Sequence, residues 1–312
     1  MSIQKVAVIG TGVMGQGIAR AMAIAGIKTT IFKVTRQEDV FQEVAKFEDR
    51  LDKEVNRGKL NSSAQTSILL NLRWLPWNSR AEILSDCDLV VESIVEDFAE
   101  KQKLFRQIDG AVKPEVILAS NTSTLSIAKL ASATGRAKRF LGLHFFNPVD
   151  KMRLVEVVQT PSVDADVVNA GKELVQLLDK TPVVSGDTPG FLVNRLLFPY
   201  LLDAIRNFEK SLGSIEDMDL AMQLGCNHPM GPFALCDYIG LDVVLKIANI
   251  FHEELRDERF EPPFLLKRLV ESGMLGLKSE KKLGFYSYGV GPKTQNPELS
   301  GFITLDRSSG AW

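Results

Sequence analysis

The chain has 312 residues, a length that suits about two domains, and its composition of 45% hydrophobic and 24% charged residues is ordinary for a globular protein. A net charge of −2 supplies no basic field for nucleic acid or an anionic membrane surface, and no apolar run approaches the roughly 18 residues of a membrane helix. The three cysteines, Cys87, Cys226 and Cys236, match neither a disulfide framework nor a zinc site, and no cluster has metal-ligand spacing. Because a strand begins near Lys5, we expect no signal peptide, a reducing cytoplasmic setting and no metal.

A strand, a glycine-rich turn and a helix open the chain. The apolar run at residues 5–10 leads into Gly10-Thr-Gly-Val-Met-Gly15, and a helical pattern follows directly. This is G-x-G-x-x-G in the strand–turn–helix context of a dinucleotide-binding site. The glycines permit a tight turn and a close approach of the backbone to a pyrophosphate, which would face the helix N-terminus. We therefore expect cofactor contacts from Gly10, Gly12, Val13, Met14 and Gly15.

The second strand, residues 29–32, ends at a basic position. A fold that prefers NAD usually has Asp or Glu there, about 20 residues after the glycine motif, to bind the ribose 2′-hydroxyl. Here Lys33 stands at that point and Arg36 is close by. A lysine accepts no hydrogen bond, whereas both side chains suit a 2′-phosphate, so the pattern favours NADP; a solvated basic surface is the alternative. We predict affinity for both nicotinamides, with NADP bound better than in most such folds.

Strands and helices then alternate. Predicted elements are a long amphipathic helix over 40–59, a short strand over 73–75, a buried strand over 88–94, a helix over 96–108 and a strand over 116–120. This alternation predicts a doubly wound parallel sheet, whose binding sites lie at the carboxyl ends of the strands. Ser123 follows the last of these strands, before a predicted helix over 125–131, and is either a site residue or an ordinary helix cap.

Residues 140–158 contain two apolar strands joined by a polar loop that starts at Asn147-Pro148. If the chain reverses at the centre of that loop, His144 faces Glu156 across the hairpin. A carboxylate between valines is costly to bury unless it is paired, and a histidine is a natural partner. Such a pair suits a general base, because the carboxylate fixes the imidazole tautomer and stabilises the imidazolium; a purely structural salt bridge is the alternative. Gly12, Ser123 and His144 all fall at the carboxyl ends of strands, which predicts one shared pocket.

The second half of the chain is mostly helical. A helix over 167–178 and a short strand over 182–184 precede the Gly- and Pro-containing stretch at 185–190, which is the best linker candidate. Helices are then predicted over 191–211, 241–255 and 263–272, with another capped by Ser214. We expect an α/β, Rossmann-like doubly wound domain at 1–186, an all-α C-terminal domain at 187–290, and a poorly ordered tail at 291–312.

Long motifs, in order along the chain, resemble those of the L-3-hydroxyacyl-CoA dehydrogenases of the short 3-hydroxybutyryl-CoA type. These are GTGVMGQGIA, VVESIVE, SNTST, HFFNP, MRLVEVV, GDTPGFLVNRLL and HPMGPFALCDYIGLD. The resemblance runs from about Lys5 to Tyr288. It implies a Rossmann domain and a helical domain that forms a homodimer interface. It also implies reversible oxidation of (3S)-3-hydroxyacyl-CoA to 3-ketoacyl-CoA by hydride transfer to NAD, with the short-chain 3-hydroxybutyryl-CoA as the expected substrate.

The resemblance also implies roles for single residues. The family's base falls on His144 and its orienting carboxylate on Glu156. The serine that bonds the substrate hydroxyl falls on Ser123, and the substrate-positioning asparagine falls on Asn194. Nicotinamide-side contacts fall on Glu96, Lys101 and Asn147. In two places the sequence departs from the family: Lys33 replaces the ribose-binding aspartate, and residues 278–284 are longer than the usual motif.

Two other functions stay open at this point. A sugar-acid dehydrogenase of the gulonate type has a similar fold but usually carries an HPxNPPY turn after its histidine, whereas HFFNPV and LVEVV favour the acyl-CoA branch. A non-catalytic protein, crystallin-like or cofactor-sensing, is the other alternative. Lys33 supports it, and the presence of all four catalytic residue types opposes it.

Overall fold

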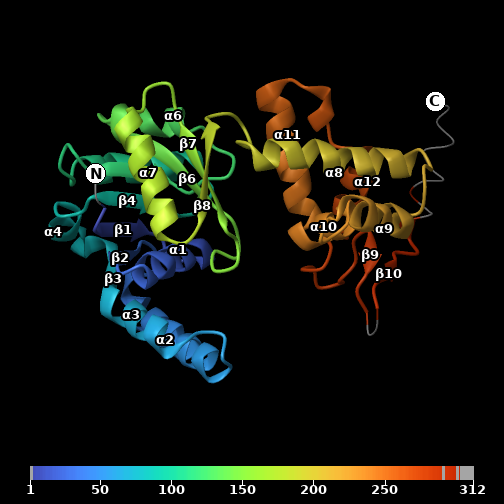
Figure 1. The fold of residues 1–312 in the computed structure, drawn as a ribbon. Coiled ribbons are helices and arrows are strands. Elements are labelled where there is room, and N and C mark those ends of the chain that lie inside the picture. Colours follow the sequence, from blue (N-terminus) through green and yellow to red (C-terminus); the bar gives the residue numbers. More distant parts are fainter. Residues whose placement is uncertain (1–2, 290–291, 300–301, 303–312) are drawn as a thin grey trace. The chain divides into compact units, whose positions relative to one another are not determined.

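The structure is a computed structural model that describes residues 3–289, 292–299 and 302 (Figure 1). The chain divides into two compact units between Phe191 and Leu192. Each unit has its own apolar core. Among the described residues, no helix combines the length and apolar character needed to cross a membrane.

An eight-stranded sheet organises the first unit, in the order β3-β2-β1-β4-β5-β6-β7-β8. Its strands are β1 Lys5–Ile9, β2 Lys28–Lys33, β3 Leu72–Pro76, β4 Leu89–Glu92, β5 Ile117–Ser120, β6 Phe140–Phe145, β7 Leu154–Gln159 and β8 Thr181–Gly186. Neighbours are parallel except β6 and β7, which are antiparallel. The mostly parallel order confirms the predicted fold class.

Side chains of the central strands alternate between two apolar clusters, one on each face of the sheet. In β1, Val6 and Val8 join the cluster packed with α1 (Val13–Ile24) and α7 (Ala165–Leu177). Ala7 and Ile9 join the other cluster, packed with α5 (Phe98–Asp109) and α6 (Ile127–Ala131). Burial on both faces explains why these strands are continuous apolar runs rather than alternating ones.

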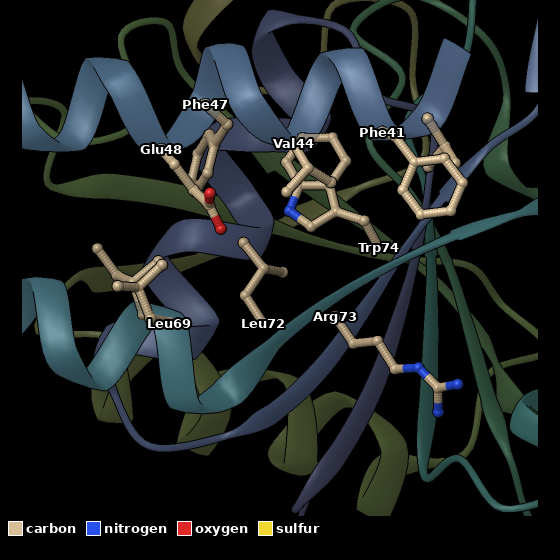
Figure 2. A pocket seen from close by; sticks show the side chains of 10 residues that line it. Phe41, Val44, Phe47, Glu48, Leu69, Leu72, Arg73 and Trp74 are labelled. Atoms are coloured by element: carbon tan, nitrogen blue, oxygen red, sulfur yellow. The ribbon is translucent and has the colours of Figure 1, made fainter. Parts of the chain in front are cut away.

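A helical pair lies between β2 and β3. The single helix predicted over 40–59 is wrong in its length: α2 (Val40–Asn56) ends before Gly58, whose φ of +66° breaks the helix, and α3 (Ser62–Asn71) follows with Asn61 as its cap. The Phe47 ring of α2 lies 5.3 Å from the Trp74 ring of β3. Figure 2 shows the apolar hollow that these side chains line with Val44, Leu69 and Leu72.

The second unit is helical, as expected, apart from a short β-ribbon. Its elements are α8 Val193–Glu209, α9 Ile215–Cys226, α10 Pro232–Ile239, α11 Leu241–Leu255, α12 Phe264–Glu271, β9 Tyr286–Ser287 and β10 Thr294–Gln295. Ser214 caps α9, as predicted, because its side chain accepts a hydrogen bond from the Asp217 N–H.

The expectation of a poorly ordered tail from residue 291 is wrong for residues 292–299. There β10 pairs with β9, and Leu299 is buried in the core of the unit. The buried Asn296 side chain donates to the Gly284 carbonyl at 2.8 Å. These contacts are long-range and polar, so the Gly- and Pro-rich composition gave no sign of them. The rest of the expected tail, Trp312 included, lies outside the described residues.

Two buried carboxylates tie the helices of the second unit to the ribbon. Asp219 of α9 accepts hydrogen bonds from the Phe233 and Ala234 N–H groups at the start of α10, and from the Tyr286 hydroxyl. Asp237 of α10 accepts from the Phe285 and Tyr286 N–H groups and from the Tyr288 hydroxyl. Burial raises the pKa of Asp237 to about 6, against the opposing effect of these hydrogen bonds.

Candidate active site

The glycine turn between β1 and α1 has the shape that a dinucleotide phosphate requires. Gly10 has a φ of +118°, and a Cβ there would lie 2.3 Å from the Ser93 carbonyl oxygen; a Cβ on Gly15 would lie 1.9 Å from the Gly10 oxygen. A Cβ on Gly12 would meet nothing within 4 Å. Gly10 and Gly15 therefore allow the turn itself, and Gly12 leaves open space at the N-terminus of α1. Val13 and Met14 lie in the first turn of that helix, and their contact with a cofactor stays a prediction.

At the carboxyl end of β2, the basic side chain predicted to bind phosphate is already paired. Lys33 is buried, and its Nζ lies 3.4 Å from Oε1 of Glu43, in the first turn of α2. Arg36 is exposed and has a φ of +47°. No sequence pattern predicted the pairing of Lys33 with Glu43, because the partner comes from a helix whose position depends on the tertiary fold.

His144 and Glu156 face each other across β6 and β7, as the hairpin predicted. They are register partners, and 2.6 Å separates His144 Nδ1 from Glu156 Oε2. Glu156 is fully buried and His144 is 6% exposed. The His144 ring packs 4.5 Å from the Phe146 ring and 5.6 Å from the Phe191 ring. Because the carboxylate engages Nδ1, Nε2 is the ring nitrogen that a proton transfer would use.

Ser123 lies in the turn after β5, and Glu96 anchors that turn. Oε1 of Glu96 accepts from the Thr122 hydroxyl at 2.5 Å, from the Ser123 N–H at 3.0 Å and from the Thr124 hydroxyl at 3.1 Å. The alternative that Ser123 caps a helix is wrong, because α6 starts later and has Ser126 as its cap. The helix predicted over 96–108 starts later than expected, because α5 begins at Phe98 and Asp97 is its cap. Glu96 therefore lies before the helix.

Behind Glu96 lies a buried ion-pair network. Lys101 is 1% exposed, and its Nζ lies 2.6 Å from Oε1 of Glu92 and 3.3 Å from Oε2 of Glu96. Glu92, at the end of β4, also accepts from the Ser120 hydroxyl at 2.6 Å. Burial alone would raise the pKa of Glu96, but the Lys101 charge and the hydrogen bonds from Thr122 and Ser123 outweigh it, and the net pKa is lowered. Lys101 thus supports Glu96 from behind; its direct contact with a nicotinamide stays a prediction.

Asn121, which the sequence analysis missed, joins the Ser123 turn to the histidine strand. Its Oδ1 accepts a hydrogen bond from the Phe145 N–H at 2.8 Å, directly after His144. The sequence offered one signal, since this asparagine lies inside the SNTST motif at the carboxyl end of a strand. Ser123 and His144 are therefore held at the same edge of the sheet.

Asn147 is exposed in the loop after β6, and it lines a hollow together with Val13 of the glycine motif. Lys180 holds this loop in place, because its Nζ donates to the Val149 carbonyl at 2.5 Å and to the Met152 carbonyl at 2.8 Å. Asn194 lies in the first turn of α8, in the second unit. Its place beside the substrate stays a prediction.

Comparison with known proteins follows the same division of the chain. The family profile described as 3-hydroxyacyl-CoA dehydrogenase, NAD binding domain, matches residues 5–188, and the C-terminal domain profile of the same family matches residues 190–288. A 3-hydroxybutyryl-CoA dehydrogenase of Bradyrhizobium diazoefficiens is 41% identical over 286 residues, which are 92% of this chain and 96% of that protein. The mitochondrial hydroxyacyl-coenzyme A dehydrogenase of Sus scrofa is 40% identical over 291 residues, covering 92% of this chain and 91% of that protein.

A solved structure gives the same result for the fold. The (S)-3-hydroxybutyryl-CoA dehydrogenase of Ralstonia eutropha matches with a TM-score of 0.86 and 38% identity, covering 92% of this chain and all of that chain. The similarity therefore extends over both units of the described structure.

Proposed function

The chain belongs to the 3-hydroxyacyl-CoA dehydrogenase family and is a nicotinamide-dependent oxidoreductase, and on that premise we propose that it interconverts 3-hydroxybutyryl-CoA and acetoacetyl-CoA with His144 as its base. The observation that carries the proposal is the buried His144–Glu156 pair, which lies at the same sheet edge as the glycine turn. The short acyl chain is inferred from the relatives that are 3-hydroxybutyryl-CoA dehydrogenases. The comparisons give no support to the sugar-acid or non-catalytic alternatives.

Each proposed role follows from an atom's position. Nε2 of His144 takes the substrate's hydroxyl proton, and Glu156 stabilises the imidazolium that forms. Ser123, fixed through Glu96, donates to the reacting oxygen. A substrate-positioning role for Asn194, in the first turn of α8, is proposed from the family resemblance alone. When bound, the nicotinamide accepts the hydride from C3. In the reductive direction the same groups return the proton to the oxygen.

The homodimer is part of the proposal. Large apolar side chains are exposed on α8 and α9: Leu196 is 74% exposed, Leu220 is 50% exposed and Leu224 is 78% exposed. Exposed apolar side chains of this kind mark interaction surfaces, and a second copy is the family's expected occupant. Light scattering of the purified protein tests this: a mass near 69 kDa, twice the chain's 34.5 kDa, is expected, and a monomer would contradict it.

Turnover measurements test the function. The protein should reduce acetoacetyl-CoA with a nicotinamide cofactor, and it should not oxidise gulonate at a comparable rate. The folded His144→Gln variant should lose about 10²- to 10⁴-fold in turnover, the usual scale of general acid–base catalysis. A matched control is His252→Gln, on α11 in the second unit. Retained turnover in folded His144→Gln would exclude His144 as the base.

A further inference from the structure

We propose that Glu43, held in place by Lys33, accepts the hydrogen bonds of the adenosine ribose and makes the site select NAD over NADP. The inference rests on the proposed function, because it requires a nicotinamide dinucleotide on the glycine turn. Other dinucleotide-binding folds usually have the ribose-binding carboxylate at the end of β2, where this chain has Lys33. The inference assigns the ribose contact to a carboxylate on α2 instead.

Lys33 stands where an adenosine ribose is normally recognised. β1 and β2 are register partners up to Ile9 and Phe32, and the Gly10 N–H donates to the Phe32 carbonyl at 3.0 Å. Lys33 is therefore the residue beside the start of the glycine turn. In doubly wound folds an acidic side chain at this point accepts the ribose hydroxyls.

The charge of Lys33 is already balanced. Its Nζ lies 3.4 Å from Glu43 Oε1, and only 9% of the lysine side chain is exposed. A 2′-phosphate placed here would meet the ammonium together with a carboxylate of its own sign. Like charges at such distances repel strongly where water is partly excluded. The pair therefore loses the advantage that an unpaired lysine would give to NADP.

Glu43 is the more accessible member of the pair. Its side chain is 28% exposed, about three times the fraction of Lys33. A carboxylate has two oxygens and accepts several hydrogen bonds, so Glu43 can bind Lys33 and still accept from ribose hydroxyls. The ammonium, as a donor only, positions that acceptor instead of meeting the ligand itself.

The seating of α2 fixes Glu43 in this place. Glu43 is in the first turn of the helix, and Phe47, one turn later, packs against Trp74 of the neighbouring strand β3. Figure 2 shows Val44 and Phe47 on the side of α2 that faces Trp74. This anchoring reduces the freedom of the helix, so the carboxylate is preorganised and little ordering is required on binding.

Direct binding of NADH and NADPH, measured by calorimetric titration, tests the proposal without turnover. The unmodified protein should bind NADH at least about 10-fold more tightly than NADPH. In Glu43→Gln, NADH should bind about 10-fold more weakly, as expected for loss of a charged acceptor, and NADPH should bind more tightly because Lys33 is released. Glu48→Gln, an exposed carboxylate on the same helix, is the matched control and should change neither affinity.

A second variant serves as a control, because Glu43→Gln alone leaves Lys33 buried without its carboxylate partner and could disturb the local fold. Lys33→Met combined with Glu43→Gln removes both charges; NADH should again bind about 10-fold more weakly, without the gain for NADPH. Tighter binding of NADPH by the unmodified protein, or an NADH-to-NADPH ratio that Glu43→Gln leaves within twofold, would overturn the inference. Failure of the unmodified protein to bind either dinucleotide would overturn the proposed function as well, so the two failures are distinguishable.

Discussion

Nδ1 of His144 lies 2.6 Å from Oε2 of Glu156, and both side chains are buried between neighbouring strands of the sheet. A buried carboxylate requires a partner, and here the partner is an imidazole, which can both accept and donate a proton. The antiparallel register between β6 and β7 holds the two residues together. The same contact therefore joins the two strands and orients the imidazole that we propose as the base.

Glu156→Gln separates these two roles. The amide keeps the shape of the side chain but does not stabilise an imidazolium, so we expect turnover to fall about 10²-fold or more with a small change in KM for substrate. Steady-state kinetics with acetoacetyl-CoA measure the loss, and thermal unfolding checks the fold. Glu173→Gln, on α7, is the control. Unchanged turnover in the folded variant would show that the His144–Glu156 pair has only a structural role.

Two glycines of the turn should respond differently to the same added methyl group. Gly12 has a φ of −69°, and a Cβ there meets no protein atom within 4 Å, so Gly12→Ala should keep its thermal stability and lose cofactor affinity by obstructing the phosphate. Gly15→Ala places its Cβ 1.9 Å from the Gly10 oxygen, so overpacking should destabilise the fold by about 1–3 kcal/mol. Thermal unfolding and NADH titration of both variants check this. Tight NADH binding by Gly12→Ala would show that the cofactor phosphate does not bind at this turn.

Glu96 should act through Ser123. One carboxylate oxygen of Glu96 accepts hydrogen bonds from the Ser123 turn and the other lies near Lys101, and Glu96→Gln replaces one of these oxygens with an amide nitrogen. We therefore expect Ser123 to be displaced and turnover to fall about 10-fold. A double-mutant cycle with Ser123→Ala distinguishes positioning from independent contributions, because coupled residues are non-additive. Glu100→Gln, exposed on α5, is the control. Strictly additive losses would show that Glu96 contributes separately.

Asp237 should make the second unit less stable as the pH rises. Its folded pKa is about 6 and its ordinary value is 3.8, so the folded state binds the extra proton between these limits. Stability contributed by that proton is complete below about pH 4, falls as the pH rises to about 6 and then stays constant, with a maximum change of about 3 kcal/mol. Denaturant unfolding at pH 4 to 7 should show this component in the unmodified protein. It should be absent from Asp237→Asn, and an identical pH slope in both would contradict the assignment.

The sequence by itself determined most features that depend on neighbours along the chain, although it missed the end of α2 before Gly58 and the Ser126 cap of α6. Continuous apolar runs marked the buried strands, and the glycine spacing marked the turn before α1. A short hairpin placed His144 opposite Glu156, because its register follows from counting residues across one loop. These features are local, so a one-dimensional pattern contains nearly all the information that specifies them.

Only the tertiary structure decided which charged and polar side chains meet. The pairing of Lys33 with Glu43, the burial of Lys101 between Glu92 and Glu96, and the docking of residues 292–299 all depend on how separate elements pack. The sequence does not show whether a lysine faces solvent or a carboxylate, and a paired lysine attracts an anionic ligand far less than an unpaired one. For that reason the sequence predicted candidate positions for the site, while only the folded chain showed which of those side chains are already paired and buried.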